Sequence, residues 1–175
     1  AQVQALTTAG VAALTTDQVQ ALTTAQVANL KTTQVVALTT DQVVAITTAQ
    51  AQALSTAAVA TLDTAQLGAL ETTDLAVFNA GQIGAIKASQ AGGLTTDQIA
   101  SLSTVQIQAL STAVLAALDA VQIGAIETVD VVVMKRAQIA AITTAQVAGI
   151  TTDQVVALTT AQVQALSTGV VGTLN

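Results

Sequence analysis

Two sets of acidic residues are the part of this sequence best suited to chemistry. Three carboxylates that meet in space can bind a hard cation such as Ca²⁺, and paired carboxylates can exchange protons with a substrate. Whether the members of a set meet depends on the elements that carry them. The sets lie 56 residues apart and consist of Asp63, Glu71 and Asp74, and of Asp119, Glu127 and Asp130.

An eight-residue repeat runs through the chain and decides where those carboxylates lie. A large apolar residue recurs at every eighth position from Leu6 to Leu174, and a second apolar column runs three residues ahead of it, from Val3 to Val171. Each column has 22 members. The consensus octad, lettered a to h, reads LTTAQVxA. A repeating unit with so few chemically versatile residues indicates a repeat architecture.

The spacing of the apolar columns excludes both a strand and one long helix. Columns a and f are separated by three and by five residues, both odd, so they would fall on opposite faces of every strand. Eight residues turn an ideal helix by about 800°, so each octad would displace the apolar stripe of a long helix by roughly 80°. A helix that restarts in every octad remains.

The polar side chains of the octad at 158–165 predict that a new helix begins in each octad. Thr159 and Gln162 form a capping box, in which the Thr hydroxyl accepts from the Gln amide and the Gln side chain returns to the Thr amide. Leu158 and Val163 then occupy the two positions of a hydrophobic staple. Column b is Ser, Thr, Asp or Asn in 17 of 22 octads, and column e is Gln in 16. We therefore expect a helix of about six residues in each octad.

Such a short helix is unstable alone, so neighbouring octads must stabilise it. The predicted fold is all-α: a solenoid of very short capped helices, one per octad, forming a single domain over residues 1–175. The alternative is a β-solenoid with ladders of Thr, against which the Gln and Ala residues at fixed positions argue.

A longer period of 56 residues, or seven octads, overlies the octad. Its copies cover residues 7–62, 63–118 and 119–174. If odd and even octads belonged to two structural classes, an octad and its counterpart in the next copy would fall into different classes, because seven is odd. We therefore expect all octads to be equivalent, with three to four octads in each coil of the solenoid.

The octad places four of the six carboxylates at helix starts. Asp63 and Asp119 are N-cap residues, and Asp74 and Asp130 lie at the third helical position, where carboxylates accept from backbone amides and favour the helix dipole. We favour this structural role over a cation site. We expect no catalytic residue, no metal ion and no cofactor.

Five charged residues are candidates for contact with another molecule. Glu71 and Glu127 stand in the cap column but are poor caps. Most of the positive charge lies at Lys87, Lys135 and Arg136, which could pair with these glutamates or with another molecule. Isolated surface ion pairs contribute about 0 to 1 kcal/mol, so a role in register or specificity is the more useful hypothesis.

The composition disfavours several classes of function. The chain has no Cys, His, Trp, Tyr or Pro, and so lacks most residues that bind transition metals, transfer protons at neutral pH or stack on bases. Four Lys and Arg residues against ten Asp and Glu give a formal charge of −6, which disfavours nucleic acid as a partner. No stretch approaches the roughly 18 apolar residues of a membrane span. We expect neither an enzyme nor a protein that binds nucleic acid or spans a membrane.

The octads LTTDQVVA, LTTAQVQA and LSTVQIQA resemble the octapeptide arrays of very large bacterial surface proteins, often labelled as adhesion or haem-utilisation proteins. The resemblance covers the whole chain and implies a secreted, repetitive, fibrous or stalk-like segment. It carries over no haem ligand, since the chain has no His and Met134 stands in apolar column a. Residues 38–46 are also similar to the opening helix of TAL-effector DNA-binding repeats, whose base-reading loop and second helix are missing here.

Two functions fit these features. The first is a structural one, an elongated rod, stalk or extracellular filament whose partner is a second copy or a longer array, joined end to end. The second is an interaction module of a bacterial adhesin that binds a protein or a glycan. Both place the chain outside the cell or at its surface.

Overall fold

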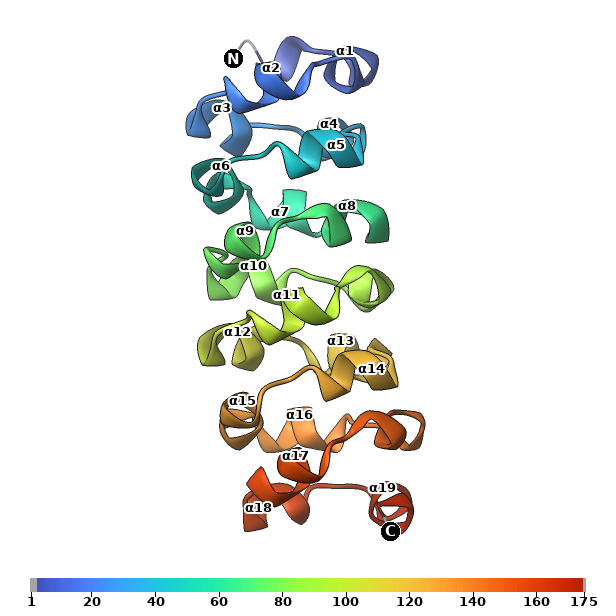
Figure 1. The fold of residues 1–175 in the computed structure, drawn as a ribbon. Coiled ribbons are helices and arrows are strands. Elements are labelled where there is room, and N and C mark those ends of the chain that lie inside the picture. Colours follow the sequence, from blue (N-terminus) through green and yellow to red (C-terminus); the bar gives the residue numbers. More distant parts are fainter. Residues whose placement is uncertain (1–2, 175) are drawn as a thin grey trace.

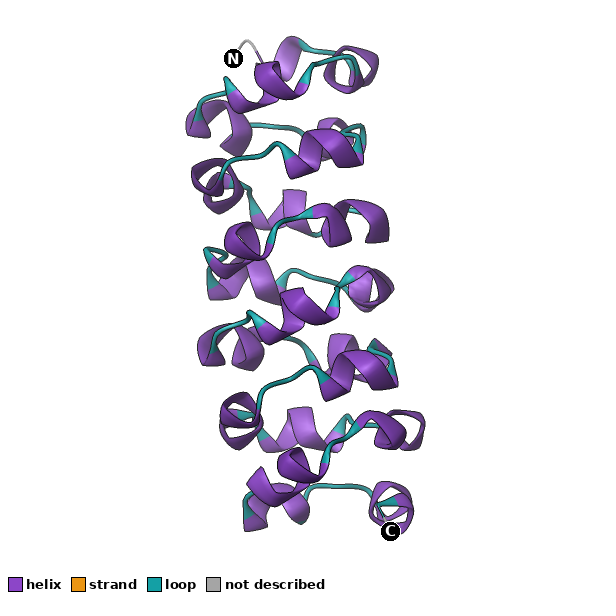
Figure 2. Ribbon diagram, viewed as in Figure 1, coloured by secondary structure: helices purple, strands orange, loops and turns teal. Residues whose placement is uncertain are grey.

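The computed structural model describes residues 3–174 as a solenoid of short helices. The chain winds in successive coils from the N-terminus to the C-terminus, and the coils stack into an elongated column (Figure 1). Among the described residues all regular structure is helical, and extended loops join one helix to the next (Figure 2). The predicted all-α solenoid is confirmed, and the β-solenoid alternative is wrong.

Each octad of the described range holds one helix of three to six residues. No helix in this range is long and apolar enough to cross a membrane. The elements, in chain order, are η1 (Val3–Ala5), α1 (Thr8–Ala12), α2 (Thr16–Gln20), α3 (Thr24–Ala28), α4 (Thr32–Val36), α5 (Thr40–Val44), α6 (Thr48–Ala53), α7 (Thr56–Val59), α8 (Thr64–Ala69), α9 (Thr72–Ala76), α10 (Ala80–Gly84), η2 (Ala88–Gly93), α11 (Thr96–Ala100), α12 (Thr104–Ala109), α13 (Thr112–Ala117), α14 (Ala120–Gly124), α15 (Thr128–Val133), α16 (Arg136–Ala140), η3 (Thr144–Gly149), α17 (Thr152–Ala157), α18 (Thr160–Val163) and α19 (Thr168–Thr173), where η marks a 3₁₀-helix.

Most of the described helices begin at a predicted capping box; α1, α7, α9, α13, α15 and α19 do not. At α11 the Thr95 hydroxyl accepts from the Gln98 amide at 3.1 Å, and the Gln98 Oε1 accepts from the Thr95 amide at 2.9 Å. Thr95 itself is extended, with φ −78° and ψ 159°. The helix ends where the Leu102 amide donates to the Ile99 carbonyl at 3.2 Å. No described residue has a positive φ, so the turn between octads needs no left-handed residue.

Columns a and f form one core that runs along the column. Column f is the more deeply buried of the two: Ile99 and Ile107 are 0% exposed, and Leu102 of column a is 4% exposed. Towards the N-terminal end column a residues such as Leu14 are only partly buried. Towards the C-terminal end burial falls in both columns: Leu166 of column a is partly buried, and Val155 and Val163 of column f are 37% and 46% exposed. The apolar pattern of the octad therefore buries its two columns against neighbouring coils.

Helices pack against helices three octads further along the chain. For example, α3 packs against α6, α6 against α9, and α12 against α15. Side-chain hydrogen bonds join consecutive coils between residues 28 and 31 positions apart. Helix contacts three octads apart and clip bonds 28 to 31 residues apart mean that a coil takes between three and four octads, so the 56-residue period corresponds to about two coils. The octads are equivalent, as expected, because the same offset holds along the whole column.

Several glycines mark the closest approach of consecutive coils. A Cβ atom added to Gly68 would lie 2.7 Å from the Gly93 carbonyl oxygen, and one added to Gly124 would lie 2.6 Å from that of Gly149. A Cβ atom at Gly93 would collide with the backbone of the preceding coil. Gly92, in contrast, has no neighbouring atom within 4 Å of that position.

Candidate functional site

The glutamine of column e links two consecutive coils. In α11, the Gln98 Oε1 accepts from the amide of its own N-cap residue, while its Nε2 donates to the Leu67 and Leu70 carbonyl oxygens of the preceding coil at 3.0 and 2.7 Å. The side chain is 1% exposed, and both ends of its amide are hydrogen-bonded. We call this arrangement a glutamine clip.

The clip recurs along the column with nearly constant geometry. Its two main bonds, to the column f and column a carbonyls of the preceding coil, measure 2.6–3.1 Å throughout. The clips are made by Gln34, Gln42, Gln50, Gln66, Gln82, Gln90, Gln98, Gln106, Gln122, Gln138, Gln146, Gln154 and Gln162.

The donor half of the clip was missed from the sequence, although a signal for it exists. A capping box accepts either Glu or Gln at its third position, yet no octad of this chain has Glu in column e. An oxygen alone would satisfy the cap, so the strict preference for an amide indicates that a second, donating contact is made.

Asp74 and Asp130 replace the glutamine in two octads and make no clip. Each is 2% exposed, and neither accepts from the amide of its N-cap residue, Glu71 or Glu127. The predicted capping role at the third helical position is therefore wrong for this pair. The Oδ2 atom of Asp74 and the Oδ1 atom of Asp130 have no hydrogen-bond partner.

The electrostatics of these two carboxyls follow from burial. Desolvation raises the pKa of Asp74 above its ordinary value; a hydrogen bond from the Thr48 hydroxyl opposes the shift, and the negative charge of Glu71 adds to it. Desolvation likewise raises the pKa of Asp130, and the charge of Glu127 adds to the effect. Both groups are thus harder to ionise than an exposed aspartate.

The two predicted sets of three carboxylates are divided by the fold. Asp63 and Asp119 cap helices, as expected, and accept from the Gln66 and Gln122 amides at 2.7 and 2.8 Å. In the part of the chain that the structure describes, no three acidic side chains come close enough to hold a metal ion. Each set is reduced to a Glu–Asp pair on one helix.

The five charged residues proposed as interaction marks lie on the surface. The Lys135 Nζ donates to the Gln108 carbonyl oxygen of the preceding coil at 2.8 Å. Within residues 3–174 no ion pair joins a Lys or Arg side chain to either glutamate, so the structure does not pair these residues with one another. The exposed residues are Glu71, Glu127, Lys87, Lys135 and Arg136.

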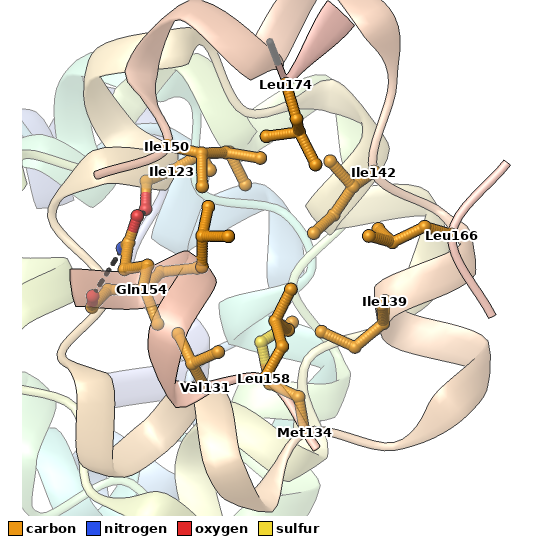
Figure 3. Close-up of a pocket in the computed structure, with 12 residues that line it drawn as sticks. Ile123, Val131, Met134, Ile139, Ile142, Ile150, Gln154, Leu158, Leu166 and Leu174 are labelled. Carbon is orange, nitrogen blue, oxygen red and sulfur yellow. Dashed lines mark hydrogen bonds between the residues drawn. The ribbon is translucent and has the colours of Figure 1, made fainter. Parts of the chain in front are cut away.

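The C-terminal coils enclose a small apolar cavity (Figure 3). Apolar side chains from successive octads, among them Ile139, Ile150, Leu158 and Leu174, converge on it, and the clip of Gln154 lies at its edge. Its volume of about 30 Å³ compares with roughly 300–1,000 Å³ for pockets that hold small molecules. The cavity is therefore too small for such a ligand and is a packing gap in the core between the last described coils.

A model of the ALTTAQ repeat family matches the chain in five segments, at residues 1–32, 24–56, 68–104, 123–160 and 131–168. Together these segments cover more than half of the chain. Comparisons with curated proteins and with solved structures find no match.

Proposed function

The chain belongs to the ALTTAQ repeat family, and we propose that it is a structural segment of a bacterial surface, working as a rod, a stalk or a unit of an extracellular filament. The observation that carries the proposal is the repeated interface between coils. Each coil rests on the preceding one through the same apolar columns and glutamine clips, so length grows with the number of octads while the cross-section stays constant. The proposal assigns no catalytic step to the chain.

Deleting one 56-residue period tests the rod. Removal of residues 63–118 preserves the octad register and takes out about a third of the 175 residues. Small-angle scattering should then show a particle shortened by about a third with an unchanged cross-section and a helical far-UV circular dichroism spectrum. A matched deletion of residues 63–114 breaks the register and should lose cooperative unfolding. A compact 63–118 deletion variant with an altered cross-section would reject the rod.

The first and last described coils carry groups that fit each other, so either a second copy or a further stretch of the same array can continue the column. At the first coil, Gln18 and Gln26 keep the capping half of the clip but donate to no carbonyl of the described chain. At the last coils, no described glutamine donates to the column a carbonyls, and the apolar cavity lies open beside them. Docking the first coil of one copy on the last coil of another continues the existing interface. The column a carbonyls of the last coils that are available for this docking belong to Ile150, Leu158 and Leu166.

Replacing the two glutamines of the first coil that lack a carbonyl acceptor tests this assembly. Replacing Gln18 and Gln26 by Glu keeps the oxygen that caps each helix but removes the donor, so filaments seen by electron microscopy should disappear. Gln20→Glu changes the charge on an exposed side chain of the same coil and should leave filaments intact. Short monodisperse particles of the unaltered chain would contradict the filament and leave the rod standing.

A second candidate function is an interaction module that binds a protein or a glycan. It is supported by a shallow depression bordered by Glu127, Thr128, Thr151 and Asp153, next to one of the charged marks. Reversing both marks with Glu71→Lys and Glu127→Lys should abolish capture of a surface partner while leaving helix content unchanged. If this variant still captures the partner, Glu71 and Glu127 do not take part in the interface.

A further inference from the structure

Where the clip pattern is broken by an aspartate, backbone carbonyls and a carboxylate face each other with no donor between them. The flanking clips of Gln66 and Gln82 reach the carbonyl groups 31 and 28 positions earlier. By the same register Asp74 faces the carbonyl groups of Val43 and Ile46, to which no side chain of residues 3–174 donates.

The Asp74 carboxylate is directed into the space between coils. Its hydrogen bond comes from Thr48, which lies two residues beyond Ile46 on the preceding coil. The residue is 2% exposed, and its Oδ2 atom has no partner. A buried, unpaired carboxylate is costly, so this group requires a proton, a cation or a bridging water.

Side-chain length argues against a proton, and the second negative charge of Glu71 on the same helix favours a cation over a water molecule. The clips hold their Nε2 atoms 2.6–3.1 Å from the carbonyl oxygens. Aspartate is shorter by one methylene, or about 1.5 Å, which places its oxygens roughly 4 to 4.5 Å from those of the carbonyls. A protonated carboxyl cannot donate across that gap. Two oxygens bound to one calcium ion at about 2.3–2.6 Å, at an angle smaller than 180°, lie a similar distance apart.

We propose that this octad binds one calcium ion between two coils, with carboxylate oxygens of Asp74 and Glu71 and the carbonyl oxygens of Val43 and Ile46 as ligands. Glu71 is exposed and makes no cap hydrogen bond, so its carboxylate is free to turn towards the ion. Calcium accepts six to eight oxygens in flexible geometry, including water. Magnesium demands near-ideal octahedral geometry at about 2.0–2.1 Å, which fixed carbonyls at this spacing do not provide.

The same set recurs one period later, which argues against an isolated substitution. Asp130 is 2% exposed with an unpaired Oδ1 atom, and Glu127 makes no cap hydrogen bond. The carbonyl groups of Ile99 and Leu102, 31 and 28 positions earlier, receive no described side-chain donor. The second ion lies between Asp130 and these carbonyls. Each ion takes the place of a missing glutamine clip, so calcium links consecutive coils at the two octads where column e is aspartate.

Calorimetric titration of the chelator-treated chain at pH 7 tests the sites. Calcium chloride should bind with two ions per chain and dissociation constants on the order of 10⁻⁴ to 10⁻³ M, and 10 mM calcium should raise Tm by at least about 5 °C. Magnesium chloride at the same concentration should raise Tm by less than half as much. No calcium-dependent heat and no shift in Tm would overturn the proposal.

Variants of column e separate the sites from general charge effects. Asp74→Gln with Asp130→Gln restores two clips, so it should abolish calcium binding and raise Tm without calcium; either single variant should keep one ion. Asp74→Asn with Asp130→Asn removes the charge with the smallest change in shape and should also abolish binding. Asp97→Asn with Asp153→Asn removes two exposed carboxylates and should retain both ions. Binding of two ions that survives in the Gln or the Asn pair would overturn the assignment.

Discussion

Octads with a glutamine clip and octads without one join consecutive coils in different ways. Gln98 ties its coil to the preceding one with hydrogen bonds and also buries its side chain. Val114, in the same column, is 0% exposed and offers apolar contact alone. Both octads share the hydroxyl half of the cap, since the Ser111 hydroxyl accepts from the Val114 amide at 3.2 Å as the Thr95 hydroxyl does from the Gln98 amide at 3.1 Å. The apolar columns thus define the coil, and the clip strengthens the joint between coils.

Valine and aspartate, which replace glutamine in column e of some octads, affect the contact between coils differently. A valine removes the donor and adds apolar contact, whereas Asp74 and Asp130 remove the donor and bury a charge. Both kinds recur with the 56-residue period, which spans two coils. The joints between coils therefore vary in strength along the column although the octads share one geometry.

The largest expected effect comes from breaking one central clip. Gln98→Ala leaves the Leu70 carbonyl and the Thr95 cap amide without the hydrogen bonds that Gln98 makes, and it removes the side-chain donor to the Leu67 carbonyl. The free energy of unfolding should therefore fall by about 3 kcal/mol. Urea unfolding followed by circular dichroism measures it. Gln52→Ala, at an exposed glutamine of column g, should change the free energy by less than about 0.5 kcal/mol. Equal effects at both positions would mean that the clip is incidental.

The next effect concerns the spacing that lets a clip close. Gly93 packs against the coil that carries Gly68, whose carbonyl lies between the two acceptors of Gln98. A methyl group at Gly93 collides with that coil's backbone, so Gly93→Ala should lower the free energy of unfolding by about 2 kcal/mol. Gly92→Ala meets open space and should be neutral or slightly stabilising. If Gly93→Ala and Gly92→Ala have the same free energy of unfolding, the coils can move apart to admit a methyl group at no cost.

Most of the octad's local structure could be predicted from the sequence because its interactions are short-range. The capping box of Thr95 and Gln98 spans three residues, so spacing alone identifies it. The donor half of the same glutamine reaches Leu70, 28 residues earlier. Finding that partner requires the number of octads per coil, which depends on coil packing. The error at Asp74 has the same origin, since its short side chain turns to the preceding coil and away from its own cap.

A third effect is the response of the aspartate octads to acid. The raised pKa values of Asp74 and Asp130 mean that the folded state binds more protons than the unfolded state between the ordinary aspartate value of 3.8 and the raised folded values. Acidification through that window should therefore stabilise the chain through these two groups. In chelator, the stability advantage of Asp74→Gln with Asp130→Gln over the unaltered chain should shrink as pH falls from 7 towards 3.8. Urea unfolding at each pH measures the difference, and an advantage that grows with acid would contradict the burial of charge.

The smallest effect separates the cap from the clip. Lys31 starts an octad that keeps its clip, because Gln34 donates to the Val3 and Leu6 carbonyls at 2.7 and 2.8 Å, but the Lys side chain makes no cap hydrogen bond. Lys31→Thr should add the missing hydroxyl and raise the free energy of unfolding by about 1 kcal/mol. Thr39→Lys makes the reverse change in the next octad and should cost a similar amount. Opposite signs of similar size would show that cap and clip contribute separately. If Lys31→Thr has no effect while Thr39→Lys destabilises, a clip already in place makes the cap redundant at Lys31, and the two halves of the glutamine act as one unit.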